Sequence, residues 1–150
     1  MTVMQRLLFS LPAWAAALWW GSLTTIGFLV VPLLFLHLDT PAIAGRMAAR
    51  LFTAQTWVSV SCTLFLLLAS RTRGDEGRSA PQSALASARL PILAGLLLAL
   101  LVELVVAPRI VARENLALWH RLGTGFYVLQ WLCAGWTFWR MSRPLSIHSG

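Results

Sequence analysis

One acidic residue, Glu103, lies within an apolar stretch that runs from Leu90 to Pro108. Placing a carboxylate in a bilayer costs at least about 3 kcal/mol, so such a residue needs a partner or a function. Counting along a helix puts Glu103 about 20 Å from Leu90, in the third of the stretch nearest Pro108. Two roles follow for Glu103: a contact between helices, or an intramembrane proton site.

Small residues recur at every fourth position on the helix face that carries Glu103. Small side chains at this spacing let a second helix approach closely. A similar series occurs in the first apolar stretch, so we expect both faces to turn toward the inside of a helix bundle. The two series are Gly95, Ala99, Glu103, Ala107 and Ala13, Ala17, Gly21, Thr25.

A partner for Glu103 must come from another helix. The last apolar stretch carries a polar stripe, Gln130, Cys133 and Thr137, at spacing i, i+3, i+7. Gln130 falls at a depth similar to that of Glu103, which makes it the predicted neutral hydrogen-bond partner. The charged candidates are Arg46, Arg50 and Arg121, since Arg109 follows Glu103 by six residues and faces elsewhere; all four arginines belong to a basic cluster expected on the outer side of the membrane.

Two histidines, His37 and His120, are also expected at this outer side. Imidazole is a common ligand of haem and of metal ions, so the pair is a candidate cofactor site if the two rings converge. The alternative is that both rings are simply solvated at the membrane surface. No phosphate-binding loop, GxSxG, HExxH or pair of carboxylates occurs in the sequence. We therefore expect no enzyme and no cofactor.

The composition identifies the environment of these residues. Hydrophobic residues make up 58% of the 150 residues and charged residues only 11%, whereas a soluble domain carries roughly 25%. The formal charge of +7 comes from 12 basic residues, which are scattered at the ends of apolar stretches. A nucleic-acid-binding surface would group them in a stripe, so this class is excluded. The chain is predicted to be an integral membrane protein.

Four apolar stretches are long enough to cross a bilayer, at residues 7–38, 47–69, 90–112 and 116–141. The predicted fold is a single all-α domain, residues 1–150, built as a four-helix membrane bundle. The first stretch exceeds the bilayer thickness and must tilt, kink or break, with Gly21, Gly27 and Pro32 as the obvious places. Asp39, Thr40 and Pro41 form a capping signal, interpreted as the start of a short helix before the second span.

The distribution of arginines predicts the orientation. Residues 70–89 form a polar loop on the same side as both termini, and that side carries seven arginines against five on the other. The positive-inside rule then places the termini and this loop in the cytoplasm of a bacterium, with the protein in the inner membrane. Most of the eight tryptophans lie near span ends, as in an interfacial belt: Trp14, Trp19, Trp20, Trp119, Trp136 and Trp139. The cysteines, Cys62 and Cys133, are interpreted as small apolar residues.

The two halves of the chain contain similar segments. The first stretch ends in FLVVPLLF and the third in ELVVAPRI, about 76 residues later. Each segment precedes a short connection and another helix. Two interpretations remain open: duplication of a helical hairpin, or chance recurrence in valine-rich helices.

Three segments together resemble the bacterial family called domain of unknown function 4149. They are WWGSLTTIGFLVVPLLF, AGRMAARLF, and VVAPRI followed by LALWHRLGTGFYVLQW, so the likeness covers roughly residues 14–135. The eukaryotic transmembrane protein 205 family is similar in layout. The resemblance implies a four-helix membrane protein but supplies no activity, and Arg121 after His120 departs from the expected pattern. It draws attention to Trp20, Gly21, Pro32, Phe35, Gly45, Arg46, Phe52, Pro108, Arg109 and His120.

These observations favour a small non-enzymatic membrane protein that acts as a helper, scaffold or assembly factor. Its expected partners are the lipid bilayer and either a second copy of the chain or another membrane protein. A transport or proton-relay element centred on Glu103 is the first alternative. A haem or metal protein that uses His37 and His120 is the second.

Overall fold

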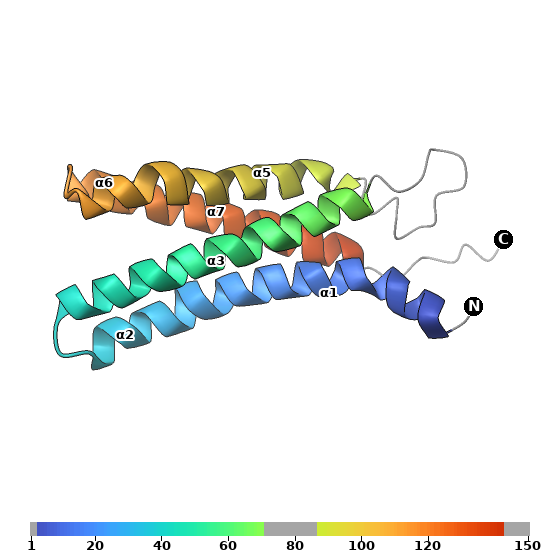
Figure 1. Cartoon of the computed structure of the whole chain (residues 1–150), viewed down its shortest axis with the longest axis horizontal. Coiled ribbons are helices and arrows are strands. Elements are labelled where there is room, and N and C mark those ends of the chain that lie inside the picture. Colours follow the sequence, from blue (N-terminus) through green and yellow to red (C-terminus); the bar gives the residue numbers. More distant parts are fainter. Residues whose placement is uncertain (1–2, 71–86, 143–150) are drawn as a thin grey trace.

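The structure is a computed structural model that describes residues 3–70 and 87–142, and within these ranges all elements are helical. Four helical rods lie side by side along one axis (Figure 1). The rods consist of α1 (Val3–Thr25), η1 (Ile26–Val30) and α2 (Val31–His37); α3 (Pro41–Ala69); α5 (Arg89–Leu101), η2 (Val102–Val106) and α6 (Ala107–Val111); and α7 (Leu116–Ser142). We call the end with the short connections 38–40 and 112–115 the turn end, and the opposite end the terminal end.

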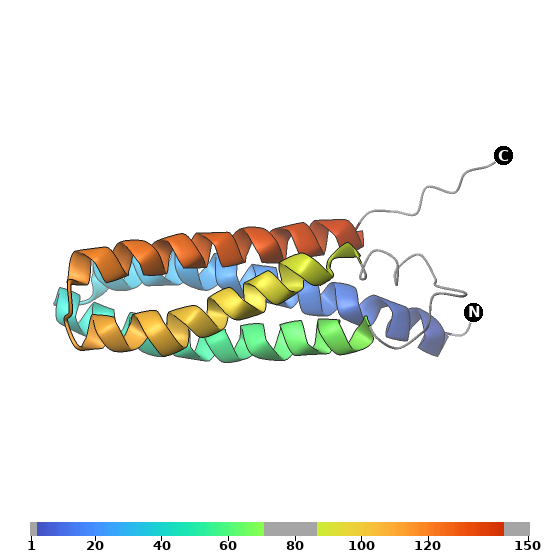
Figure 2. The same cartoon turned by 90° about the horizontal axis from the view of Figure 1, so that it is seen from above.

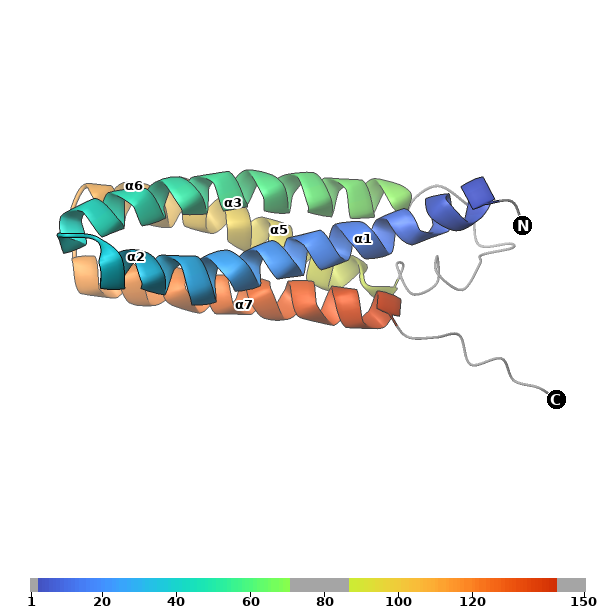
Figure 3. The ribbon, with the colours of Figure 1, turned by 90° about the horizontal axis from the view of Figure 1, so that it is seen from below.

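Each rod packs against two neighbours, and the views from above and below agree on the arrangement (Figures 2 and 3). The α1 rod lies between α3 and α7, and the α5 rod also lies between α3 and α7. The core between them includes the buried residues Ala16, Trp19, Leu23, Cys62, Leu66, Ile92 and Ala134.

Three of the predicted spans are supported by helices of the required length and apolar character. These helices are Ser10–His37, Pro41–Ala69 and Arg89–Val111. Large apolar side chains are exposed along them, including Leu18 at 59%, Trp57 at 66% and Leu97 at 59%. Such surfaces are typical of contact with lipid. The fourth predicted span does form a helix, α7, but Arg121, Gln130 and several glycines and threonines make it less apolar.

Two rods change from α-helix to π-helix shortly before a proline. The π segment η1 ends two residues before Pro32, and η2 ends two residues before Pro108. A proline has no N–H for the helical bond to the residue four positions earlier, so the preceding turn must rearrange. The predicted irregularity of the first span is thus found around Gly27 and Pro32, whereas Gly21 lies within regular α1.

One predicted boundary needs correction at the turn end. The second span begins at Pro41, not at residue 47, because the capping signal belongs to α3 itself. The hydroxyl of Thr40 accepts a hydrogen bond from the backbone N–H of Ile43, at 3.3 Å. No separate short helix precedes α3 in this described part of the chain. Most of the predicted loop 70–89, namely 71–86, lies outside the described residues, and α5 begins at Arg89.

The inward face of α1 differs from the predicted small-residue face. The buried residues are Ala16, Trp19 and Leu23, whereas Thr25 is exposed. A Cβ atom on Gly21 would meet nothing within 4 Å, so no helix approaches closely there. Trp19 turns inward because Gly95 on α5 leaves room for its indole. On α5 the prediction is confirmed for Gly95 and Ala99, which are both buried.

Candidate functional site

Glu103 lies in η2, at the seam between the α5 rod and α3. Its Oε1 accepts a hydrogen bond from the hydroxyl of Thr53 on α3, at 2.9 Å. Glu103 is half-buried; Trp57, one helical turn from Thr53 on α3, and Leu104, next to Glu103 in the sequence, are 66% and 68% exposed. Among the described residues, Thr53 is the hydrogen-bond partner found for this carboxylate. Glu103 therefore makes a contact between helices and is half-buried rather than enclosed in the core.

A second polar group lies in the centre of the fold and consists of four residues, Ser22, Gln55, Ser59 and Gln130. We call it the amide cluster. Nε2 of Gln55 donates to the hydroxyls of Ser22, at 3.0 Å, and of Ser59, at 3.3 Å. Nε2 of Gln130 donates to the same Ser59 hydroxyl, at 2.9 Å. The cluster thus joins α1, α3 and α7 near the middle of their lengths.

The expected pairing of Glu103 with Gln130 is therefore wrong. Gln130 contacts Ser59 across the core, whereas Glu103 contacts Thr53 at the surface. A similar depth along the helices does not determine the angular position around the bundle, and the pairing depends on both. The polar stripe on α7 is otherwise found as predicted, since Gln130 and Thr137 are buried and the hydroxyl of Thr137 donates to the carbonyl of Cys133 at 2.8 Å.

An aromatic ring from another rod packs against each of three glycines. These contacts hold the α1 rod, the α5 rod and α7 together around the amide cluster. The indole of Trp19 lies over Gly95, and that of Trp20 lies over Gly135. The ring of Tyr127 lies over Gly27 in η1, and its hydroxyl donates to the carbonyl of Leu23 at 2.8 Å.

Aromatic packing continues along the seam between α1 and α7. The ring of Trp20 stacks on Phe138, with centroids 5.7 Å apart, and tilts against Trp131 at 6.1 Å. Nε1 of Trp131 donates to the hydroxyl of Thr24, at 2.9 Å. Trp19 and Trp20 therefore belong to the packed interior, which corrects their assignment to an interfacial belt.

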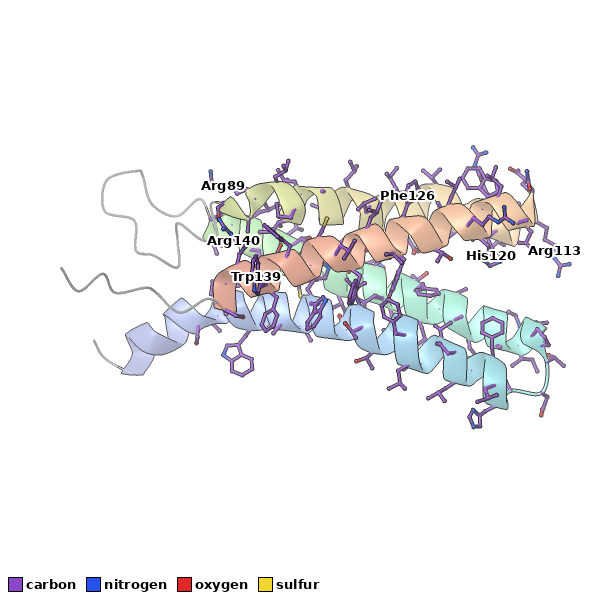
Figure 4. The ribbon with its side chains drawn as sticks, turned by 180° about the vertical axis from the view of Figure 1, so that it is seen from behind. Arg89, Arg113, His120, Phe126, Trp139 and Arg140 are labelled. Atoms are coloured by element: carbon purple, nitrogen blue, oxygen red, sulfur yellow. The ribbon has the colours of Figure 1, made fainter. Side chains whose placement is uncertain are left out.

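The four arginines of the predicted basic cluster, Arg46, Arg50, Arg109 and Arg121, are all exposed, on parts of their helices nearer the turn end. Figure 4 shows Arg113 and His120 at the same end, and Arg89, Trp139 and Arg140 at the opposite end. Arg109 stacks over Trp119, 4.7 Å from the ring centroid, and its Nη1 is 3.7 Å from a carboxylate oxygen of Glu114. Both partners of this ion pair are exposed, so its effect on stability is small.

The two candidate ligand histidines are both exposed and lie on different helices. Nδ1 of His37 is 3.1 Å from the carbonyl oxygen of Leu33 on its own helix. His120 lies on the first turns of α7, where its carbonyl accepts from the hydroxyl of Thr124. Within residues 3–70 and 87–142, no group of three or more His, Cys, Asp or Glu side chains could hold a metal ion.

The residues highlighted by the family resemblance have different environments. Trp20 and Phe52 are packing residues, and the ring of Phe52 meets that of Tyr127 edge-on at 5.3 Å. Pro32 and Pro108 follow the two π segments. Phe35 is 52% exposed, and a Cβ atom on Gly45 would meet nothing within 4 Å.

Sequence reasoning missed Ser22, Gln55, Ser59 and Thr53. One signal was present: Gln55 and Ser59 are four residues apart, and Thr56 and Thr63 continue the polar side of the same apolar stretch. Gln55, Thr56, Ser59 and Thr63 are all buried in α3. A polar face within a membrane span indicates an inward orientation, because polar groups avoid lipid.

Comparison with known proteins identifies a family to which the chain is similar. No curated protein and no solved structure matches the chain. The domain of unknown function DUF4149 matches residues 14–117, which include both π segments, Thr53, Glu103 and the helices α3 to α6. The match ends at the start of α7, so the resemblance predicted for residues 118–135, with His120 and Gln130, lies beyond it. The chain belongs to the DUF4149 family.

Proposed function

We propose that this protein is a non-enzymatic membrane scaffold that binds a transmembrane helix of another membrane protein. In this proposal the fold is a four-helix membrane bundle in a bacterial inner membrane, with α7 as the fourth span. The four tryptophans of α7 support that assignment, because tryptophan is favoured at membrane interfaces although hydropathy scales count it as polar.

The observation that carries the proposal is the position of Glu103. Its carboxylate lies at the α3–α5 seam with one hydrogen bond, from Thr53, and among exposed apolar side chains. A carboxylate beside lipid costs at least about 3 kcal/mol, and a hydrogen-bond donor on a docked helix would offset that cost. The expected partner is therefore a transmembrane helix with Arg, Lys, Ser or Thr at the depth of Glu103.

Site-specific photo-crosslinking in native membranes tests this proposal. A crosslinker at Leu104, next to Glu103, should capture a partner protein, whereas one at Leu18, which is equally lipid-exposed on α1, should not. The Glu103→Gln variant should keep the adduct because the amide oxygen still accepts a hydrogen bond, and Glu103→Leu should lose it. Equal adducts from Leu104 and Leu18, or adducts that survive Glu103→Leu, would contradict the proposal. An adduct of twice the chain's own mass would identify the partner as a second copy.

A proton-relay role for Glu103 is a second candidate, and one observation favours it. The residue lies in a π segment, a structure that is frequent at functional sites. Against it, the hydroxyls of Thr56 and Thr63 donate to carbonyls of their own helix and leave no donor chain from Glu103 into the core. Proton flux into proteoliposomes that falls at least tenfold with Glu103→Gln would support the relay and contradict the scaffold.

A haem or metal site at His37 and His120 is the third candidate. No contact between the two rings supports it, and each has a solvated environment at the turn end. An absorption spectrum and metal analysis of the purified protein test it, because bound haem gives an intense Soret band.

We also infer that the two halves of the chain are copies of one helical hairpin. The π segments begin at Ile26 and Val102, 76 residues apart, and Trp19 contacts Gly95 at the same separation. Gln55 and Gln130 are 75 residues apart and donate to the same hydroxyl of Ser59. Contacts between equivalent positions are expected when two copies pack about a two-fold axis.

Sequences of relatives test the duplication. When the two halves of each relative are aligned with one another, the prolines equivalent to Pro32 and Pro108 should coincide. Agreement no better than that of shuffled halves would contradict the inference.

A further inference from the structure

The amide cluster contains buried polar atoms that the protein itself leaves without partners. Oε1 of Gln55 has no hydrogen-bond partner, although the residue is only 2% exposed. Nε1 of Trp19, a fully buried residue, also has none. Buried donors and acceptors are nearly always paired, and an unpaired one costs about 1–3 kcal/mol. Two orphaned atoms in one cluster therefore point to a missing partner.

Trp19 is joined to the amide cluster through its backbone carbonyl, so the two residues with orphaned atoms belong to one hydrogen-bonded chain. The hydroxyl of Ser22 donates to the carbonyl of Trp19, at 3.0 Å, and accepts from Nε2 of Gln55, also at 3.0 Å. Ser59 adds a third unmet requirement. Its hydroxyl oxygen accepts two N–H bonds, from Gln55 and Gln130, so both lone pairs are occupied and its own proton needs an acceptor.

The chemistry of the missing partner follows from these three atoms. Nε1 of Trp19 and the Ser59 hydroxyl require an acceptor, and Oε1 of Gln55 requires a donor. If the Gln55 amide were turned around, Nε2 would replace Oε1 as the orphaned atom and would also require an acceptor. In either orientation the cluster needs a small neutral molecule with an acceptor oxygen.

We propose that the amide cluster is a binding site for one water molecule at the centre of the membrane bundle. The water donates to Gln55 Oε1 and accepts from the Ser59 hydroxyl and Trp19 Nε1, which gives three of the two to four partners typical of buried water. It links α1 to α3 independently of the direct Gln55–Ser22 bond. Gln55 is the middle residue of α3, so the bound water lies far from both ends of the helix.

NMR of protein with ¹⁵N-labelled tryptophan, reconstituted in lipid nanodiscs, tests this site. The Trp19 indole signal is assigned by its loss in Trp19→Phe. In the wild-type protein, Trp19 Hε1 should show a magnetisation-transfer cross-peak to water, although its residue is fully buried. The Gln55→Leu variant should reduce this cross-peak at least fivefold, while the Trp131 indole signal, held by Thr24, keeps its position. Ser61→Ala, an exposed change on the same helix, should leave the cross-peak intact.

The wild-type measurement decides the question even if Gln55→Leu does not fold. A Trp19 signal without any water cross-peak would show a dry cluster and overturn the proposal. A cross-peak that persists at full strength in folded Gln55→Leu would place the water elsewhere and would overturn it too. Glu103 has no contact with the cluster, so the outcome is independent of the scaffold function.

Discussion

A Cβ atom on Gly95 would lie 2.5 Å from the indole carbons Cζ2 and Cη2 of Trp19. Real Cβ atoms do not come so close to other carbons. The position of the Trp19 indole on α1 therefore requires a glycine at position 95 on α5. The two residues lie in rods that face each other across the core, and Trp19 is fully buried. This pair, with Trp20 on Gly135 and Tyr127 on Gly27, interlocks the α1 rod with the α5 rod and α7.

Gly95→Ala should destabilise the protein. Overpacking costs about 1–3 kcal/mol, whereas replacing a helical glycine gains at most about 1 kcal/mol. We therefore expect a lower free energy of unfolding, by roughly 1–2 kcal/mol, measured by denaturation in detergent micelles. Gly21→Ala is the control, because a Cβ atom there meets nothing within 4 Å, and it should be neutral or stabilising. Equal effects of the two substitutions would show that the ring does not fill this notch.

Tyr127→Phe should weaken the attachment of α7 to the first rod. The substitution keeps the ring over Gly27 but removes the hydroxyl that donates to Leu23. The expected loss is about 1 kcal/mol of unfolding free energy, the usual effect of one hydrogen bond. Tyr127→Leu, which also removes the ring from its glycine, should cost clearly more. Similar losses for both variants would mean that the hydroxyl, not the ring, supplies the whole contact.

Ser59→Ala should cost more than the loss of a surface hydroxyl. Two amide donors, from Gln55 and Gln130, lose their shared acceptor, and bonds of this kind in membranes contribute roughly 0.6 kcal/mol each. We expect a destabilisation of about 1–2 kcal/mol in unfolding experiments. Ser61→Ala on the exposed side of α3 should change stability by less than about 0.5 kcal/mol. No difference between the two variants would contradict the role of Ser59 as the centre of the cluster.

Arg113→Gly should stabilise the turn between α6 and α7. Arg113 has φ of 58°, in the left-handed region that costs a side chain about 1–2 kcal/mol and costs glycine almost nothing. The expected gain is about 0.5–1 kcal/mol, seen as a higher thermal midpoint. Ala112→Gly, next to it at φ of −70°, should instead lower the midpoint. A decrease with Arg113→Gly would mean that the guanidinium contributes more than the backbone strain removes.

The sequence predicted what depends on length and on local chemistry. Apolar length predicted the rods, Pro32 was among the places where the first span was predicted to be irregular, and a contact between helices was one of the two roles expected of Glu103. The sequence did not predict which residues face one another around the axis of the bundle. Trp19 replaced the small residues on the inward face of α1, since a large ring packs inward wherever a facing glycine leaves space, and the sequence does not show which glycine faces it. Gln130 was paired with the wrong residue for the same reason.

Both π segments have a consequence for the geometry of the whole bundle. A π turn contains about one residue more than an α turn, and each residue of an α-helix corresponds to a rotation of about 100°. The residues between each π segment and the turn end are therefore out of phase with the rest of their rod. Deleting one residue, such as Leu29 from η1 or Val105 from η2, would restore a continuous α-helical phase. The residues of α2 and α6, with Arg109 among them, would then keep their direction around the axis, as would the packing of Trp19 on Gly95, because the deletion removes only the residue that the π turn accommodates.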